Sequence, residues 1–161
     1  MDAELLDRLE MEHRQVEELF AKLEKAEEAS EQRPLVDQLV AALTQHMDVE
    51  ETDVYPEVRK LDSEMEAEAE NEHNLAREGM TKLQELIGEP GFGAAVAMLK
   101  AGISHHVEEE EGDVFPKLRE ALGFPAADAS KRELYEQAKA AGIEGRSSMT
   151  KDELAAALQR A

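Results

Sequence analysis

Two stretches of this chain decide its fold: His46-Met47-Asp48-Val49-Glu50-Glu51 and, 60 residues later, His106-Val107-Glu108-Glu109-Glu110-Glu111. The similarity extends beyond them, since 8 of 21 positions are identical between residues 41–61 and 101–121. Residues i and i+4 lie on the same face of a helix, so each His-x-x-x-Glu can point both side chains into one interior. The chain therefore carries a duplicated helical pattern.

The same shift of 60 residues superimposes Glu12-His13 on Glu72-His73, so each half supplies one lone histidine and one His-x-x-x-Glu. This pattern predicts two metal ions held between two helical hairpins. The candidate metal ligands are His13, His46, Glu50, His73, His106 and Glu110. Two metals need more donors than these six side chains, so solvent or a small ligand fills the rest. Imidazole and carboxylate without sulfur suit iron or manganese, and would also accept zinc or copper.

The composition excludes several classes of protein. The 161 residues contain no cysteine, which removes disulfides, thiolate metal sites and thiol catalysis. No apolar run approaches the roughly 18 residues that cross a bilayer. Residues 1–4 lack the basic and apolar regions of a signal peptide, so we expect a cytoplasmic protein with no membrane partner.

The net charge of −20 is unevenly distributed. Residues 130–161 hold six Lys/Arg and five Asp/Glu, which leaves 12 basic and 33 acidic residues in 1–129. Such an acidic surface repels nucleic acid, whose binding depends on neutralising phosphates, and it favours the capture of cations. We therefore do not expect a nucleic-acid partner.

The fold class predicted by the helical spacing of apolar residues is all-α. We expect helices over about 2–29, 34–54, 63–87 and 92–114, joined in an up-down-up-down four-helix bundle. Pro34 suits the first turn of the second helix. Pro56 and Pro116 should kink or interrupt their helices, leaving a short turn through Leu61 in the first half. Ser63 and Glu66 form a capping box at the start of the third helix.

A domain boundary follows the bundle. We predict a bundle domain over 1–122, a linker over 123–129 that has lost the helical period, and a small helix-loop-helix over 130–161. The small unit has capping boxes at Ser130–Glu133 and Thr150–Glu153, and Gly142 ends its first helix. Its expected small core is Leu134, Ala138, Ile143, Met149, Leu154 and Leu158. Because about 32 residues are few for independent stability, this unit either docks on the bundle or folds only marginally.

The pattern His…His-x-x-x-Glu…His…His-x-x-x-Glu, with Glu-Glu and an aromatic-Pro after each pair, resembles the hemerythrin-like (HHE cation-binding) family over residues 1–122. The resemblance implies a non-haem di-iron centre with an oxo or hydroxo bridge and carboxylate bridges. By position, the four histidines would be terminal ligands and the two glutamates, Glu50 and Glu110, bridging ones. Glu51 and Glu111 would either support these ligands or bind metal themselves.

Two positions depart from the oxygen-carrying hemerythrins. Those proteins have a second histidine four residues after the third-helix His, and here that residue is Arg77, so one iron loses a nitrogen ligand. A more open site favours peroxide turnover or irreversible oxidation over reversible oxygen storage. The carriers also use a His-x-x-x-x-Asp spacing in the last helix, which His105 and Glu110 would imitate. The repeat register favours His106, so we expect His105 to be exposed or to support the site indirectly.

Tyr55 lies five residues after Glu50, near the expected mouth of this half of the site. Its hydroxyl could donate a hydrogen bond to a bound oxygen species or quench an oxidant. Aromatic packing explains the residue without either role.

Residues 133–154 resemble the small N-terminal helical module of transcription-termination factor Rho and SAP-like modules. The Ala-Gly-Ile-Glu-Gly-Arg-Ser run at 141–147 carries this likeness. Such modules are used on nucleic acid or on partner proteins. With a net charge of only +1 beside an acidic bundle, a protein partner or a passive helical cap is the better expectation.

These observations predict a di-iron protein that binds or reacts with small oxidants, namely O2, H2O2 or NO. It would act as a redox sensor or as a peroxide-consuming protein, with catalase-like turnover as the enzymatic form. The alternatives are a metal-binding, iron-buffering protein without turnover, and an interaction module acting through residues 130–161.

Overall fold

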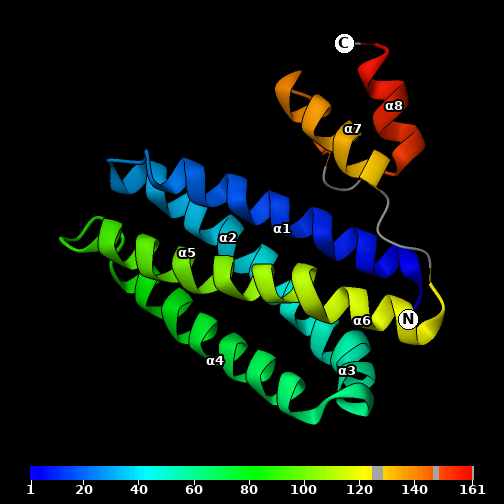
Figure 1. Ribbon diagram of the computed structural model, residues 1–161. Helices are drawn as coiled ribbons and strands as arrows, with labels where there is room; N and C mark the ends of the chain where they lie inside the picture. The colour runs from blue at the N-terminus through cyan, green and yellow to red at the C-terminus, as the bar shows by residue number, and fades with distance from the viewer. Residues whose placement is uncertain (125–128, 147–148, 161) are drawn as a thin grey trace.

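The computed structural model describes residues 1–124, 129–146 and 149–160. Its four long helices are α1 (Ala3–Leu23), α2 (Ala29–Val49), α4 (Ser63–Glu85) and α5 (Phe92–Glu109), which lie side by side (Figure 1). Helix α1 contacts α2 and α5, and α4 contacts the same two, so the four form a closed bundle of two hairpins. A small helical unit, α7 (Ala129–Ala140) and α8 (Lys151–Leu158), follows the bundle. The predicted all-α bundle with a C-terminal helix-loop-helix is therefore confirmed.

The two His-x-x-x-Glu helices do not end at their prolines. Helix α2 passes into a π-helix, η1 (Glu50–Val54), and then into α3 (Tyr55–Leu61). Helix α5 repeats this with η2 (Glu110–Val114) and α6 (Phe115–Leu122). Pro56 and Pro116 stand in the first turn of α3 and α6, just after the wide π turn, where a missing N–H costs least. The predicted short turn through Leu61 is wrong, because those residues form a helix.

Helix α1 ends at Leu23, earlier than predicted, and the turn to α2 occupies residues 24–28. The buried Gln32 holds this turn, since its side-chain amide donates to the carbonyls of Ala26 (3.2 Å) and Glu27 (3.3 Å). Helix α2 therefore begins at Ala29. Pro34 lies in its second turn, and the prediction that it occupies the first turn is wrong.

The cap of α4 also differs from the expected one. Asp62 Oδ1 accepts hydrogen bonds from the backbone N–H of Glu64 (3.0 Å) and of Met65 (3.1 Å), so Asp62 is the N-cap. The side chain of Glu66, predicted to cap the helix together with Ser63, instead pairs with Arg59. The capping box at Ser63 is therefore wrong by one residue.

The C-terminal unit packs its own apolar side chains together and against α1. Met11 of α1 is buried with Tyr135, Ala138 and Leu154, and the other predicted core residues pack around them. The Thr150–Glu153 capping box is present, and Gly142 follows α7 with φ 69°, as predicted. Residues 125–128 of the expected linker and the side chain of Ser130 lie outside the described residues.

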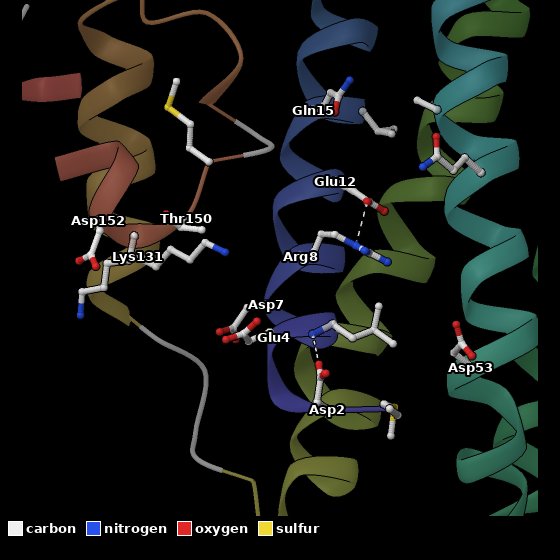
Figure 2. A pocket seen from close by; sticks show the side chains of 17 residues that line it. Asp2, Glu4, Asp7, Arg8, Glu12, Gln15, Asp53, Lys131, Thr150 and Asp152 are labelled. Atoms are coloured by element: carbon white, nitrogen blue, oxygen red, sulfur yellow. Dashed lines mark hydrogen bonds and ion pairs between the residues drawn. The ribbon is translucent and has the colours of Figure 1, made fainter. Parts of the chain in front are cut away.

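Polar contacts to a single glutamate strengthen this docking. The Tyr135 hydroxyl donates to Glu18 Oε1 (3.1 Å), Arg146 pairs with Glu18, and the Arg146 guanidinium lies 5.7 Å from the centre of the Tyr135 ring. Beside the contact, a groove separates α1 from the unit, with acidic side chains on the α1 wall (Figure 2). The small unit is therefore docked on the outer face of α1.

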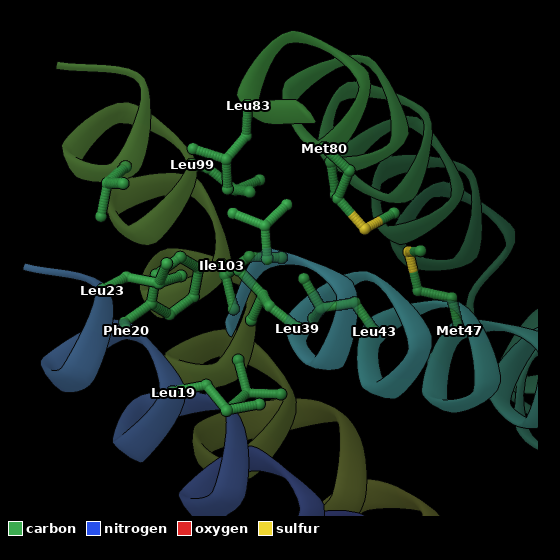
Figure 3. Packing of buried hydrophobic residues seen from close by; sticks show 14 of the residues in the cluster. Leu19, Phe20, Leu23, Leu39, Leu43, Met47, Met80, Leu83, Leu99 and Ile103 are labelled. Carbon is green, nitrogen blue, oxygen red and sulfur yellow. The ribbon is translucent and has the colours of Figure 1, made fainter. Parts of the chain in front are cut away.

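The bundle core consists of two apolar clusters. The larger contains Leu19, Phe20, Leu39 and Leu83 among others (Figure 3), and the smaller forms around Leu6, Leu9, Val54 and Phe115. Along α1, α4 and the continuous α2–η1 and α5–η2 segments, the candidate histidine falls between residues of one cluster and residues of the other. The core thus positions a polar layer across the middle of the bundle. No helix of the described ranges is long and apolar enough to cross a membrane.

Candidate metal centre

The polar layer consists of four buried histidines, one from each long helix: His13, His46, His73 and His106, all at most 4% exposed. They converge in pairs through their Nε2 atoms. His13 Nε2 lies 3.0 Å from His46 Nε2, and His73 Nε2 lies 3.1 Å from His106 Nε2. Two ligands bound to one metal at about 2.0–2.2 Å are roughly 3 Å apart, so each pair has the spacing of two ligands on one ion.

Glu50 connects the two pairs. It is fully buried, with Oε1 3.1 Å from His46 Nε2 and Oε2 3.2 Å from His73 Nε2. Each oxygen thus faces a histidine of a different pair. Within the described part of the chain neither oxygen has a hydrogen-bond partner. A buried carboxylate that lacks hydrogen bonds is costly even beside imidazoles, and a cation would satisfy both of its oxygens.

Glu110 repeats this arrangement from the other half. It is 1% exposed, Oε2 lies 3.3 Å from His13 Nε2, and Oε1 lies 3.5 Å from His106 Nε2. Its oxygens also lack a hydrogen-bond partner among the described residues. The layer therefore offers two positions for cations. His13, His46, Glu50 and Glu110 surround one, and Glu50, His73 and His106 surround the other, with Glu110 Oε1 beside His106. This donor set fits the metal pair expected from the sequence.

Each histidine is oriented by a further carboxylate on its outer nitrogen, Nδ1. The four pairs are His13 with Glu111 (2.9 Å), His46 with Glu12 (3.0 Å), His73 with Glu51 (2.9 Å) and His106 with Glu72 (2.7 Å). An acceptor on Nδ1 fixes the ring and leaves the Nε2 lone pair for a metal. Glu51 and Glu111 thus support the histidines in this structure.

Glu12 and Glu72 were missed as site residues by the sequence argument. Their signal was present, because the repeat superimposes Glu12-His13 on Glu72-His73. It could not be interpreted without the fold, since each glutamate serves the histidine of the next helix rather than its own neighbour in sequence.

Burial and charge act against each other on these groups. Burial lowers the pKa of His46, but Glu50 and the hydrogen bond to Glu12 outweigh it and raise that pKa to about 10. Burial is likewise outweighed at His106, where Glu110 and the bond to Glu72 raise the pKa to about 9. Without metal, His46 and His106 therefore form imidazolium–carboxylate pairs, so an incoming cation must displace their protons.

The two positions differ in their aromatic neighbour. The Tyr55 hydroxyl lies 2.8 Å from His73 Nε2, whereas Phe115, at the equivalent place, stacks on His13 with ring centres 6.0 Å apart. Burial, together with the Glu110 and Glu50 carboxylates, raises the pKa of the Tyr55 phenol, so the hydroxyl stays protonated. Tyr55 therefore brings a hydrogen-bond donor to the metal position of His73.

Arg77 and His105 lie outside the buried layer. Arg77, where the oxygen carriers have a histidine, donates to Glu51 Oε1 (2.8 Å). His105 has a 61% exposed side chain, while His106 points inward, as the repeat register predicted. Neither residue joins the six candidate ligands that the structure brings together.

The π-helices place the carboxylates. Glu50 and Glu110 are the first residues of η1 and η2. The backbone carbonyl of each accepts the i+5 hydrogen bond that defines the wide turn, from the backbone N–H of Tyr55 and of Phe115 respectively. In this turn Glu50 points into the bundle and Glu51 reaches His73 across the helix interface. The local backbone thus lets two consecutive acids serve one site.

Residues 4–118 match the family model of the hemerythrin HHE cation binding domain. The chain belongs to the hemerythrin HHE cation-binding family. The family description names a cation site, and the buried histidine–glutamate layer is the candidate for it in this chain. Residues 130–161 match the N-terminal domain of the Rho termination factor. No curated protein and no solved structure is significantly similar to this hemerythrin-family chain.

Proposed function

We propose that this hemerythrin-family chain holds two non-haem iron ions and uses them to bind or react with a small oxidant. His13 and His46 would hold one ion and His73 and His106 the other, with Glu50 and Glu110 shared by both. The observation that carries the proposal is that the two buried carboxylates face both histidine pairs and, among the described residues, have no hydrogen-bond partner.

Iron is favoured over a purely structural cation because the protein side chains leave coordination positions on each ion free. The four side chains at one position and the three at the other are fewer than the five or six donors that iron takes. An iron pair supplies electrons and vacant positions for O2, H2O2 or NO. The surrounding residues exclude water, orient the imidazoles through their Nδ1 atoms, and place the Tyr55 hydroxyl at the layer. The resulting function is that of a redox sensor or a peroxide-consuming protein.

A second candidate is metal storage or buffering without turnover. It is favoured by the burial of all six candidate ligands, which allows a cation to be held without exchange. A third role, protein binding through residues 130–161, is compatible with the docked C-terminal unit.

We propose that the chain is divided into a bundle domain over 1–122, a linker over 123–129 and a small helical unit over 130–161. We also propose a cytoplasmic location and no nucleic-acid partner.

Iron per chain and peroxide consumption test the proposal together, on protein expressed with iron and freed of loosely bound metal. We expect two irons per chain, peroxide consumption, and loss of both in Glu50→Gln. Glu108→Gln neutralises an exposed acid on α5 and should change neither. Iron without peroxide, O2 or NO reactivity would favour buffering. Zinc alone, or no metal, would overturn the proposal.

A further inference from the structure

A second His-x-x-x-Glu overlaps the one that enters the metal layer. His105 and Glu109 precede His106 and Glu110 by one residue each, so their side chains point away from the layer on a neighbouring face of α5. His105 Nε2 lies 3.4 Å from Glu109 Oε1 and 3.7 Å from Glu72 Oε1 of α4. One ligand atom from each of the three lies within 4.8 Å of the others. This outer cluster is accessible, with His105 61% and Glu109 42% exposed.

The first half of the chain lacks the outer cluster. The repeat places Gln45 and Val49 where the second half has His105 and Glu109. Glu12, the counterpart of Glu72, has Arg8 beside it instead, with Arg8 Nε 3.4 Å from Glu12 Oε1. Among the described residues this three-residue cluster therefore occurs in the second half and not at the equivalent place in the first, where Gln45 and Val49 show which residues the helix accepts instead.

Glu72 connects the outer cluster to the buried layer. Its Oε2 accepts from His106 Nδ1 at 2.7 Å, while its Oε1 faces His105. A single side chain thus belongs to the surface cluster and to the support of a candidate ligand.

We propose that Glu72, His105 and Glu109 form an outer binding site for a divalent transition-metal ion, from which the ion enters the buried layer. One imidazole and two carboxylates suit such an ion, with water on its remaining positions. Few protein ligands and high exposure make the outer site weaker than the buried one, as an entry site requires. The delivery step rests on the proposed function; the outer site itself does not.

Zinc binding to the full-length, metal-free protein tests the outer site. The double variant His105→Gln/Glu109→Val copies the residues of the first half, so it should fold as the wild type does. We expect the wild type to bind one more zinc ion per chain than the double variant by equilibrium dialysis. Glu108→Gln, a matched loss of one acid from α5, should bind as the wild type. Equal binding in wild type and double variant would overturn the site.

Delivery is measured by mixing the same three proteins with Fe²⁺ under anaerobic conditions and adding a chelator at timed intervals. The double variant should reach the same chelator-resistant content at least about tenfold more slowly, the low end of what local attraction contributes to association rates. Equal rates would overturn delivery. If no protein retains chelator-resistant metal but the difference of one zinc ion persists, the buried iron centre fails and the outer site stands.

Discussion

The two halves of the bundle share the same inner frame but differ around it. Each supplies a lone histidine, a His-x-x-x-Glu, a π-helix that begins with the inward carboxylate, and an acid on every Nδ1 atom. The differences lie one layer out: Tyr55 against Phe115, and His105 against Gln45. The comparison teaches that the inner histidines and their Nδ1 acids are matched between the halves, whereas the carboxylates and the hydrogen bonding around each cation position are not.

The strongest test removes one histidine from each half. His46→Ala and His106→Ala should each lose metal, because each deletes one of the two nitrogens at a position. Metal at 100 times its Kd contributes about 2.7 kcal/mol, so the melting temperature should fall by about 5–10 °C in both variants. Elemental analysis and calorimetry measure the two effects. Metal loss in only one variant would break the equivalence of the halves.

A smaller effect is expected from the acids on Nδ1. Glu12→Gln and Glu72→Gln leave a weaker acceptor for His46 and His106, and loss of such a partner typically lowers metal affinity about 10–100-fold. Competition with a chromophoric chelator measures this affinity. Glu4→Gln, an exposed change on α1, is the control. Unchanged affinity in both variants would show that the hydrogen bonds do not position the ligands.

In the metal-free protein, the two halves should differ in the pH at which their histidines lose a proton. The folded-state pKa is about 10 for His46 and about 9 for His106, both raised from 6.5. The stability they contribute is complete below pH 6.5 and is lost as the pH rises through 9 and 10. Chemical unfolding across this range should therefore show falling stability, and NMR of the imidazoles should show His106 losing its proton first. The reverse order would contradict the stronger charge effect at His46.

The smallest effect comes from exchanging the aromatic neighbours. Tyr55→Phe should change stability by only about 0.5–1.5 kcal/mol, the net value of one hydrogen bond, because Phe115 shows that a phenyl ring fits this place. Metal content should stay the same while the rate of peroxide consumption changes. Phe115→Tyr adds a hydroxyl beside His13 and should make the two positions more alike. An unchanged rate in both variants would assign Tyr55 to packing alone.

The helices and the inward register could be predicted from sequence because helical periodicity and a 60-residue repeat are both local patterns. His106 rather than His105 followed from that register, and the structure has it inside. The π-helices could not be predicted, since no residue pattern distinguishes them from a proline kink. The start of α2 was misplaced because Gln32 holds the preceding turn through its side chain. The role of Glu12 required knowing which helix packs next to α1.

The crossing carboxylates also bear on the ancestry of the molecule. Each half contains both histidines of one position. Its glutamates also reach the opposite half: Glu50 and Glu51 contact His73, and Glu110 and Glu111 contact His13. A symmetric pair of identical halves would therefore already contain every group of the centre, as a two-fold interface is self-complementary. Joining the halves in one chain removes the requirement that they stay identical. Tyr55 and His105 are the kind of single-sided change that only the fused chain can acquire.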